Sequence, residues 1–290
     1  MTTNTVWLHV ESTSRCNAWC PFCPRNNQGY GLVENLIPQD LEIEKLTQTI
    51  KHFPKLHTVQ LCGNLGDPLA AKNIDDQINA ILSFKNIKHV QIHTNGSLRS
   101  KSWWRDIVQK TKNIDLTVWF AIDGNETNHT LYRQGTNYHN IIENAREFIN
   151  AGGQAIWQFI LFEHNKNDVP ECYNLSQSLG FRDFKLIKNV RSDSKSYHYQ
   201  TGEELAIKNY KSTHTVDKNI QKMIVQEKNC MHLSYPSIYL NAKGQIKPCC
   251  YMDQQSITPN DIIESFAKQN YFPTCITSCG NQISTDKKTL

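Results

Sequence analysis

The chain has 290 residues, of which 39% are hydrophobic, with a mean hydropathy of −0.55. That length suits one barrel-sized domain with a small appendage, and the lack of a run of about 18 apolar residues excludes a membrane span. No charged segment followed by an apolar one begins the chain, so we expect no secretory signal and a cytoplasmic location. The net charge is only +4, and the more basic residues 182–228 also carry acids, which argues against nucleic acid as a partner.

Apolar β-branched segments alternate with helical patterns over the first two thirds of the chain. Such strand–helix units imply parallel strands joined by right-handed crossovers, in a doubly wound sheet or a full or partial barrel. In either α/β fold, reactive groups belong at the C-terminal ends of the strands. The predicted strands are 6–11, 57–62, 88–93, 114–122, 155–162 and 181–187, and the predicted helices are 38–53, 73–85, 102–110, 138–151 and 169–179.

After residue 187 the alternation stops, and a polar connector is expected as far as residue 229. A hairpin follows, with strands over 237–240 and 245–248 and Gly244 in the turn, and then a short helix over 260–268. This tail is too small to bury a core of its own. A bound metal is a common substitute for a core in so small a unit.

Ten cysteines point to metal, because a reducing compartment disfavours disulfides. Cys16, Cys20 and Cys23 have the spacing C-x3-C-x2-C in a loop after the first strand. Three thiolates can hold three irons of a [4Fe–4S] cluster and leave the fourth iron open to a ligand. The alternatives are a zinc site, which ordinarily has a fourth protein ligand, and unrelated thiols.

With Phe22 before the third cysteine, this run resembles the signature of the radical S-adenosylmethionine (SAM) superfamily. The resemblance implies a partial (β/α)6 TIM-like barrel that carries a [4Fe–4S] cluster on Cys16, Cys20 and Cys23. It implies that the open iron chelates the amino and carboxylate groups of SAM. The expected reaction is reductive cleavage of SAM to a 5′-deoxyadenosyl radical, which takes a hydrogen atom from a substrate.

Residues 62–68, Cys-Gly-Asn-Leu-Gly-Asp-Pro, resemble the Gly-Gly-Glu-Pro segment of the same family. The resemblance implies that Gly63, Asn64, Gly66 and Asp67 bind the SAM amino group, since glycine lets a backbone approach its ligand closely. Asp67 stands where the family usually has Glu, which puts the fit in doubt. Without the cysteine motif, the same residues would be an ordinary glycine turn.

A third segment, residues 120–133, resembles the Ser-Ile-Asp-Gly … Arg region of family members that modify peptides and small molecules. The resemblance implies a role for Asp123 and pairs Arg133 with the SAM carboxylate, although Ala121 replaces the commoner Ser. The alternative for Arg133 is an ion pair on a helix surface. Asn95 and Ser97 are expected either to bind the ribose hydroxyls or to form an Asx turn.

The C-terminal cysteines resemble those of auxiliary-cluster domains found behind many radical SAM barrels. Five cysteines suit the one-cluster version, the twitch domain, because the SPASM domain carries about seven. Cys249 is preferred to Cys250 because it has the family's spacing from Gly244, and a four-cysteine zinc site is the alternative. The predicted parts are a barrel (1–190), a connector (191–229) and an α+β auxiliary domain (230–290), with a second [4Fe–4S] cluster on Cys230, Cys249, Cys275 and Cys279.

The resemblance therefore predicts an oxidoreductase that binds SAM, two [4Fe–4S] clusters and a small-molecule or peptide substrate. Net oxidation through the auxiliary cluster is expected, with an electron donor such as flavodoxin or ferredoxin. Cys16 lies so near the start that we expect no leader-binding domain, which favours a small molecule or a peptide presented by a partner. The alternatives are a maturase of ribosomal peptides, an RNA-modifying radical enzyme, and a non-enzymatic iron–sulfur electron-transfer protein.

Overall fold

The computed structural model describes residues 6–189, 191, 195–211 and 237–250. Among these residues, no helix is long and apolar enough to cross a membrane. The predicted helix over 260–268 lies outside the described residues. So do three of the four cysteines predicted for the second cluster, namely Cys230, Cys275 and Cys279.

One eight-stranded sheet organises the molecule, in the order β10-β9-β1-β2-β3-β4-β5-β6. Neighbouring strands are parallel except for β10, which is antiparallel to β9, and the sheet has two free edges. The prediction of a partial barrel is thus confirmed. The strands are β1 (Trp7–Val10), β2 (Thr58–Leu61), β3 (His89–Thr94), β4 (Asp115–Ala121), β5 (Gln154–Leu161), β6 (Asp183–Lys188), β9 (Ser237–Leu240) and β10 (Ile246–Lys247).

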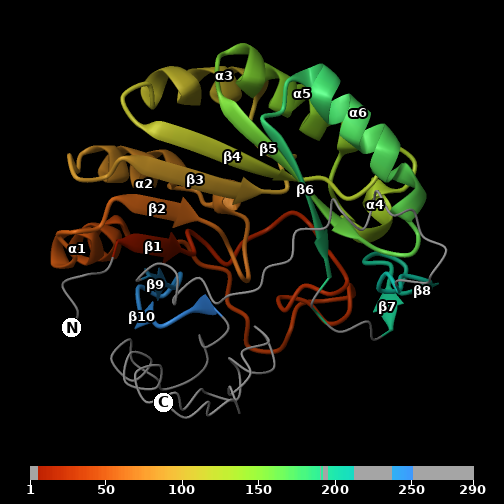
Figure 1. The fold of residues 1–290 in the computed structure, drawn as a ribbon. Coiled ribbons are helices and arrows are strands. Elements are labelled where there is room, and N and C mark those ends of the chain that lie inside the picture. The colour runs from red at the N-terminus through yellow and green to blue at the C-terminus, as the bar shows by residue number, and fades with distance from the viewer. Residues whose placement is uncertain (1–5, 190, 192–194, 212–236, 251–290) are drawn as a thin grey trace, which may run out of the picture.

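Helices cover the outer face of the curved sheet (Figure 1). Their ends follow local chemistry: the Ser100 side chain caps one helix by accepting from Trp103 N at 3.2 Å, and Gly180 ends another with a left-handed φ of 83°. The helices are α1 (Ile43–His52), α2 (Ile74–Leu82), α3 (Lys101–Lys110), α4 (His129–Tyr132), α5 (Tyr138–Asn150) and α6 (Val169–Leu179), with 3-10 turns η1 (Pro68–Ala70) and η2 (Lys166–Asp168).

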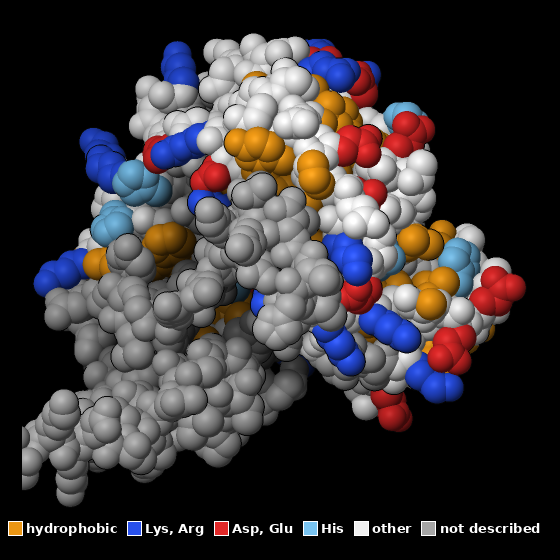
Figure 2. All heavy atoms as spheres, turned by 45° about the vertical axis from the view of Figure 1, so that its right-hand side comes forward, with side chains coloured by type: hydrophobic (Ala, Val, Ile, Leu, Met, Phe, Trp, Pro, Cys, Tyr) orange, Lys and Arg blue, Asp and Glu red, His pale blue; other side chains and the backbone are white. Residues whose placement is uncertain are grey.

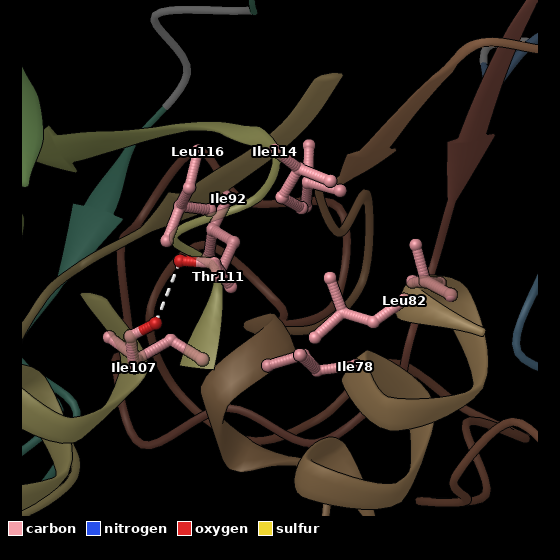
Figure 3. Close-up of a pocket in the computed structure, with 9 residues that line it drawn as sticks. Ile78, Leu82, Ile92, Ile107, Thr111, Ile114 and Leu116 are labelled. Carbon is pink, nitrogen blue, oxygen red and sulfur yellow. Dashed lines mark hydrogen bonds between the residues drawn. The ribbon is translucent and has the colours of Figure 1, made fainter. Parts of the chain in front are cut away.

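The main core lies between the sheet and these helices. Figure 3 shows one part of it, where Ile78 and Leu82 of α2 face Ile92 of β3 across a small apolar pocket. Thr111 follows α3 there and satisfies its hydroxyl locally, by donating to the Ile107 carbonyl at 2.7 Å. The pocket has no space for a water molecule. It is therefore a packing feature of the core.

Two predicted segments differ from the structure. Helix α1 begins at Ile43 and not at residue 38, because residues 38–42 instead pair with the loop after β1. Ser14 N donates to Gln39 O at 2.9 Å, and Leu41 N donates to Ser12 O at 2.9 Å. These contacts use the backbone groups that a first helical turn would leave free.

Part of the predicted connector is ordered structure. Strands β7 (Ser196–Tyr197) and β8 (Glu204–Leu205) form a second, antiparallel sheet. Leu205 and Ile207 then pack in the same apolar cluster as Cys20 and Phe22. This segment therefore covers the cysteine loop, a contact between distant parts of the chain that its polar sequence does not indicate.

The predicted hairpin is confirmed as β9 and β10, but it does not stand apart from the barrel. Strand β9 pairs in parallel with β1, in the register Leu240 to Val10, and so extends the barrel sheet. The hairpin that begins the predicted auxiliary domain is thereby fixed beside the strand that precedes the cysteine loop.

Candidate active site

The three cysteines of the first motif lie together in the loop that follows β1. Cys20 is buried, and Cys23 N donates to Cys20 O at 2.9 Å, which closes a turn. Phe22 points into an apolar cluster, with its ring centroid 6.0 Å from those of both Tyr132 and Phe162. The aromatic residue of the motif thus anchors the loop to residues that follow β4 and β5.

Nitrogen donors surround two of the sulfur atoms. Ala18 N donates to Cys16 Sγ at 3.3 Å, Asn95 Nδ2 approaches the same atom at 3.8 Å, and Arg133 Nη1 approaches Cys20 Sγ at 3.7 Å. Hydrogen bonds to sulfur are one of the ways in which a protein tunes an iron–sulfur cluster.

Burial governs the pKa values of two of these thiols. Burial, followed by the nearby Asp67 carboxyl, raises the pKa of Cys16. Burial also raises the pKa of Cys20, although Arg133 opposes that shift. A thiolate at such a position becomes favourable beside a metal centre. Among the described residues, no three His, Cys, Asp or Glu side chains lie so that they could bind one metal ion. A [4Fe–4S] cluster has a different requirement, because each of its thiolates binds a separate iron. The donor set therefore fits an iron–sulfur cluster.

The loop after β2 lies against the cysteine loop and depends on two glycines. A Cβ on Gly63 would lie 1.8 Å from Gly66 O, and one on Gly66 would lie 1.9 Å from Thr13 O. Asp67 N donates to Arg15 O at 2.8 Å, which fastens this loop directly to the residue before Cys16. Both glycines are therefore required by close backbone approach.

Asp67 joins the loops after β2 and β3. Its carboxylate accepts from Thr94 Oγ1 at 2.9 Å, from Asn95 N at 2.7 Å and from Leu69 N at 3.0 Å. Burial raises the pKa of Asp67, and these hydrogen bonds act in the opposite direction. Asp67 holds Asn95 beside Cys16.

Asn95 and Ser97 form the local turn that was one of the two expectations for them. Ser97 N donates to Asn95 Oδ1 at 2.9 Å, and Ser97 Oγ also donates to that oxygen at 2.7 Å. Asn17 Nδ2 donates to Ser97 Oγ at 2.8 Å, and Asn95 Nδ2 donates to Asn17 Oδ1 at 2.9 Å. This network ties the turn after β3 to the cysteine loop.

Asp123 and Arg133 form a buried ion pair at the ends of β4 and α4. Arg133 Nε donates to Asp123 Oδ2 at 2.6 Å, and the side chains are 14% and 0% exposed. The other carboxylate oxygen accepts from Ile160 N at 2.6 Å. The pair is thus internal, unlike the helix-surface ion pair that was the alternative for Arg133. The same guanidinium places its Nη1 3.7 Å from Cys20 Sγ.

The family model described as "Radical SAM superfamily" matches residues 10–175, more than half of the chain. The chain belongs to the radical SAM superfamily. Membership implies a SAM ligand and a [4Fe–4S] cluster, and the matched region contains the three cysteines described above.

Two curated relatives match part of this radical SAM protein. GTP 3′,8-cyclase of Aquifex aeolicus is 33% identical over 93 residues, which are 31% of this chain and 27% of the relative. 7,8-Dihydro-6-hydroxymethylpterin dimethyltransferase of Methanocaldococcus jannaschii is 26% identical over 150 residues, which are 49% and 28% of the two chains. The matches span less than a third of each relative.

Solved radical SAM structures share the fold at low sequence identity. Streptococcus suis SuiB bound to S-adenosylmethionine is similar with a TM-score of 0.63 and 15% identity, over 96% of this chain and 68% of that chain. A second structure, anSMEcpe with bound AdoMet, has a TM-score of 0.51 and 19% identity, over 63% of this chain and 49% of the other. These similarities concern the architecture of the barrel.

The sequence interpretation missed two side chains that shape this radical SAM site. The buried Glu11 carboxylate accepts from Leu65 N and from Gly66 N, and Tyr239 Oη donates to its other oxygen. Arg25 Nε donates to Leu65 O at 2.9 Å. Glu11 and Arg25 thus both hold Leu65, in the loop after β2. The one available signal was an acid placed directly after an apolar strand.

The tail cysteines of this superfamily member are described only at Cys249 and Cys250. Asn64 Nδ2 donates to Cys250 O at 3.4 Å, so the end of the β9–β10 hairpin reaches the loop after β2. Cys62 is the first residue of that loop. Burial, followed by the Glu11 and Asp67 carboxyls, raises the pKa of Cys62 to about 12. The predicted second cluster stays a prediction, because its other three ligands lie outside the described residues.

Proposed function

We propose that this chain binds SAM on a [4Fe–4S] cluster held by Cys16, Cys20 and Cys23, and acts on a C–H bond of a small-molecule or peptide substrate. The cluster and SAM, when bound, supply a 5′-deoxyadenosyl radical that abstracts a hydrogen atom. The observation that carries the proposal is the set of three thiols in one loop at the C-terminal end of β1, with N–H donors directed at the sulfurs of Cys16 and Cys20.

The remaining residues of the site position this chemistry. The loop with Gly63, Asn64, Gly66 and Asp67 is proposed to present its backbone to the SAM amino group, because its glycines hold it close to the cysteine loop. The packing of Cys20 and Phe22 in an apolar cluster excludes water from that side of the site. The other proposed contacts for SAM are Phe22, Asn95, Ser97, Asp123 and Arg133.

For the tail, we propose a second [4Fe–4S] cluster on Cys230, Cys249, Cys275 and Cys279. The hairpin supports this, since Gly244 occupies its turn with a φ of 77° and Cys249 follows β10. A four-thiolate cluster supplies an electron-accepting centre when bound. The proposed outcome is therefore a net two-electron oxidation of the substrate by an oxidoreductase.

A peptide-modifying maturase is the second candidate. SuiB has also been solved bound to the precursor peptide SuiA, in a structure with a TM-score of 0.63 and 15% identity to this chain. The curated relatives, by contrast, carry names that refer to GTP and to a pterin. Substrate assays should therefore include peptides as well as small heterocycles.

The direct test is 5′-deoxyadenosine formation by the anaerobically reconstituted protein with dithionite and SAM, followed by chromatography. We expect product from the wild type and none from Cys20→Ala. The matched control is Cys172→Ala, which removes a fully buried thiol on α6 and should retain activity. Product from Cys20→Ala at the wild-type rate would contradict the proposal. Bound iron without any 5′-deoxyadenosine from the wild type would favour the electron-transfer protein.

A further inference from the structure

The buried ion pair of Asp123 and Arg133 includes a residue that follows a very short helix. Helix α4 spans only His129–Tyr132, and Arg133 comes directly after it. A single helical turn is not stable by itself in water, because helix formation is cooperative and its first turn is costly. The position of Arg133 must therefore come from contacts with other parts of the chain.

The His129 side chain supplies such contacts from the first position of α4. It is fully buried, and its Nδ1 accepts a hydrogen bond from Asp123 N at 3.1 Å. The other ring nitrogen, Nε2, lies 3.1 Å from Thr136 Oγ1, which itself donates to Arg133 O at 2.6 Å. One imidazole ring thus connects the backbones of both members of the ion pair.

The partners of His129 fix the protonation of its ring. A backbone N–H can only donate, so Nδ1 must be unprotonated. The Thr136 hydroxyl uses its hydrogen for Arg133 O, so Nε2 must carry the proton and donate to the hydroxyl oxygen. Burial, followed by the charge of Arg133, lowers the pKa of His129 to about 3, which keeps the ring neutral. With both nitrogens engaged, the ring is a rigid connector.

The connected group is a guanidinium beside the cysteine loop. Arg133 Nε donates to Asp123 Oδ2 at 2.6 Å, and Nη1 lies 3.7 Å from Cys20 Sγ. Within the described residues, these contacts engage two of the three guanidinium nitrogens and leave Nη2 for the SAM carboxylate of the proposed function. A guanidinium binds a carboxylate through directional hydrogen bonds, so a shift of the side chain should cost affinity.

Surface charges lack this fixed geometry. Lys and Arg side chains lie intermixed with Asp and Glu over the described part of the face in Figure 2. Exposed charges are screened by salt and their pairs hold one geometry weakly. Arg133 differs, because its side chain is 14% exposed and that of Asp123 is 0% exposed. The contacts that orient this internal cation therefore decide how it meets an anionic ligand.

We propose that His129 is a positioning residue for SAM, which acts through Thr136 on the orientation of Arg133. The inference rests on the proposed function, because it deepens the role given there to Arg133 as a contact for SAM. His129 acts at one remove from the ligand: it fixes the residue that contacts SAM.

The test changes the hydroxyl of Thr136 and measures SAM binding to the anaerobically reconstituted protein by equilibrium dialysis. Thr136→Val keeps the shape of the side chain but removes the hydroxyl, and should raise the dissociation constant of SAM about fivefold, the equivalent of one hydrogen bond. Thr136→Ser keeps the hydroxyl and should bind SAM like the wild type. The matched control is Thr111→Val, which removes a hydroxyl that donates to Ile107 O at 2.7 Å and should leave SAM binding unchanged.

A double variant separates one shared connection from two independent effects. His129→Asn keeps an amide oxygen near the place of Nδ1 but breaks the link to Thr136, so it should also weaken SAM binding by about fivefold. Combined with Thr136→Val, it should weaken binding no further, because both changes break the same connection. The Thr136 pair of variants decides the matter by itself if His129→Asn does not fold.

Several results would overturn the inference. Equal weakening of SAM binding by Thr136→Val and Thr111→Val, or by Thr136→Val and Thr136→Ser, would show that the hydroxyl has no special role. Unchanged affinity in Thr136→Val would do the same, and a double variant about 25-fold weaker would show two independent effects. Loss of cluster iron from Thr136→Val would assign the network to the cysteine loop and also contradict the inference. Failure of the wild type to bind SAM would instead contradict the proposed function.

Discussion

Residues that lie side by side across the strands form rows in the main sheet. Two neighbouring rows, which point to opposite faces of the sheet, differ in polarity. The outer row, against the helices, is apolar throughout, whereas the inner row, one residue earlier in each strand, is polar. The registers give the outer row as Leu240, Val10, Leu61, Ile92, Val118 and Ala155, and the inner row as Tyr239, His9, Gln60, Gln91, Thr117 and Gln154.

Two side chains of the inner row, His9 and Gln60, make polar contacts with neighbouring residues. His9 Nε2 contacts Cys62 O at 2.7 Å, and Trp7 Nε1 donates to Gln60 Oε1 at 3.0 Å. Gln60 Nε2 contacts His93 Nε2 at 3.2 Å. Buried polar groups cost free energy unless they are satisfied, so an interior of this kind is not the simplest way to fill a barrel. The outer row therefore packs in the core, whereas His9 of the inner row contacts the first residue of the loop after β2.

Substitution of adjacent residues in β3 tests that division most strongly. Ile92→Ala removes a 1% exposed side chain from the core and should lower the free energy of unfolding by about 3 kcal/mol. Gln91→Ala, its neighbour on the inner face, should cost less than about 1 kcal/mol. Chemical denaturation of the two variants measures both values. Equal losses would break the comparison.

Glu11 directly follows β1, and its substitution should lower both the stability of the protein and its affinity for SAM. Glu11→Ala leaves Leu65 N and Gly66 N without their acceptor, which should cost about 2 kcal/mol of stability. SAM affinity should fall by about tenfold, because the loop proposed to bind SAM loses its anchor. Glu11→Gln keeps an acceptor oxygen and should restore most of the affinity, which equilibrium dialysis with SAM can measure. A full loss in both variants would point to the charge and not to the hydrogen bonds.

A further effect, which develops gradually, concerns pH. Burial, with His9 nearby, lowers the pKa of His93 to about 3 from its usual 6.5. Between these values the unfolded chain takes up a proton that the folded chain does not, so stability should fall as the pH drops from about 6.5. The slope from this residue is at most about 1.4 kcal/mol per pH unit. His93→Gln should flatten the pH profile of denaturation of the metal-free protein by that amount, and an unchanged profile would contradict the assignment.

Most of the barrel could be predicted because its signals are local. Helix α6 has the predicted bounds of 169–179, and each predicted barrel strand overlaps an observed one. The start of α1 was wrong because residues 38–42 pair with the segment after β1, and periodicity does not report such tertiary pairing. Strands β7 and β8 were missed because only two residues of each pair.

The candidate site could be found for the same reason. The cysteine motif and the loop of Gly63 and Gly66 are contiguous in sequence, so their spacing is visible. Glu11 and Arg25 bind that loop from distant positions in the sequence, and Tyr239 of β9 supports Glu11 by donating to its carboxylate. Such contacts follow only from tertiary packing, which pairs β1 with both β2 and β9.

The central claim is that Cys16, Cys20 and Cys23 hold a cluster of their own. Iron and sulfide should be measured after anaerobic reconstitution of the wild type and of a variant with all three residues changed to Ala. Two [4Fe–4S] clusters predict about eight irons per chain in the wild type and about four in the variant. The same iron and sulfide content in both proteins would contradict the account.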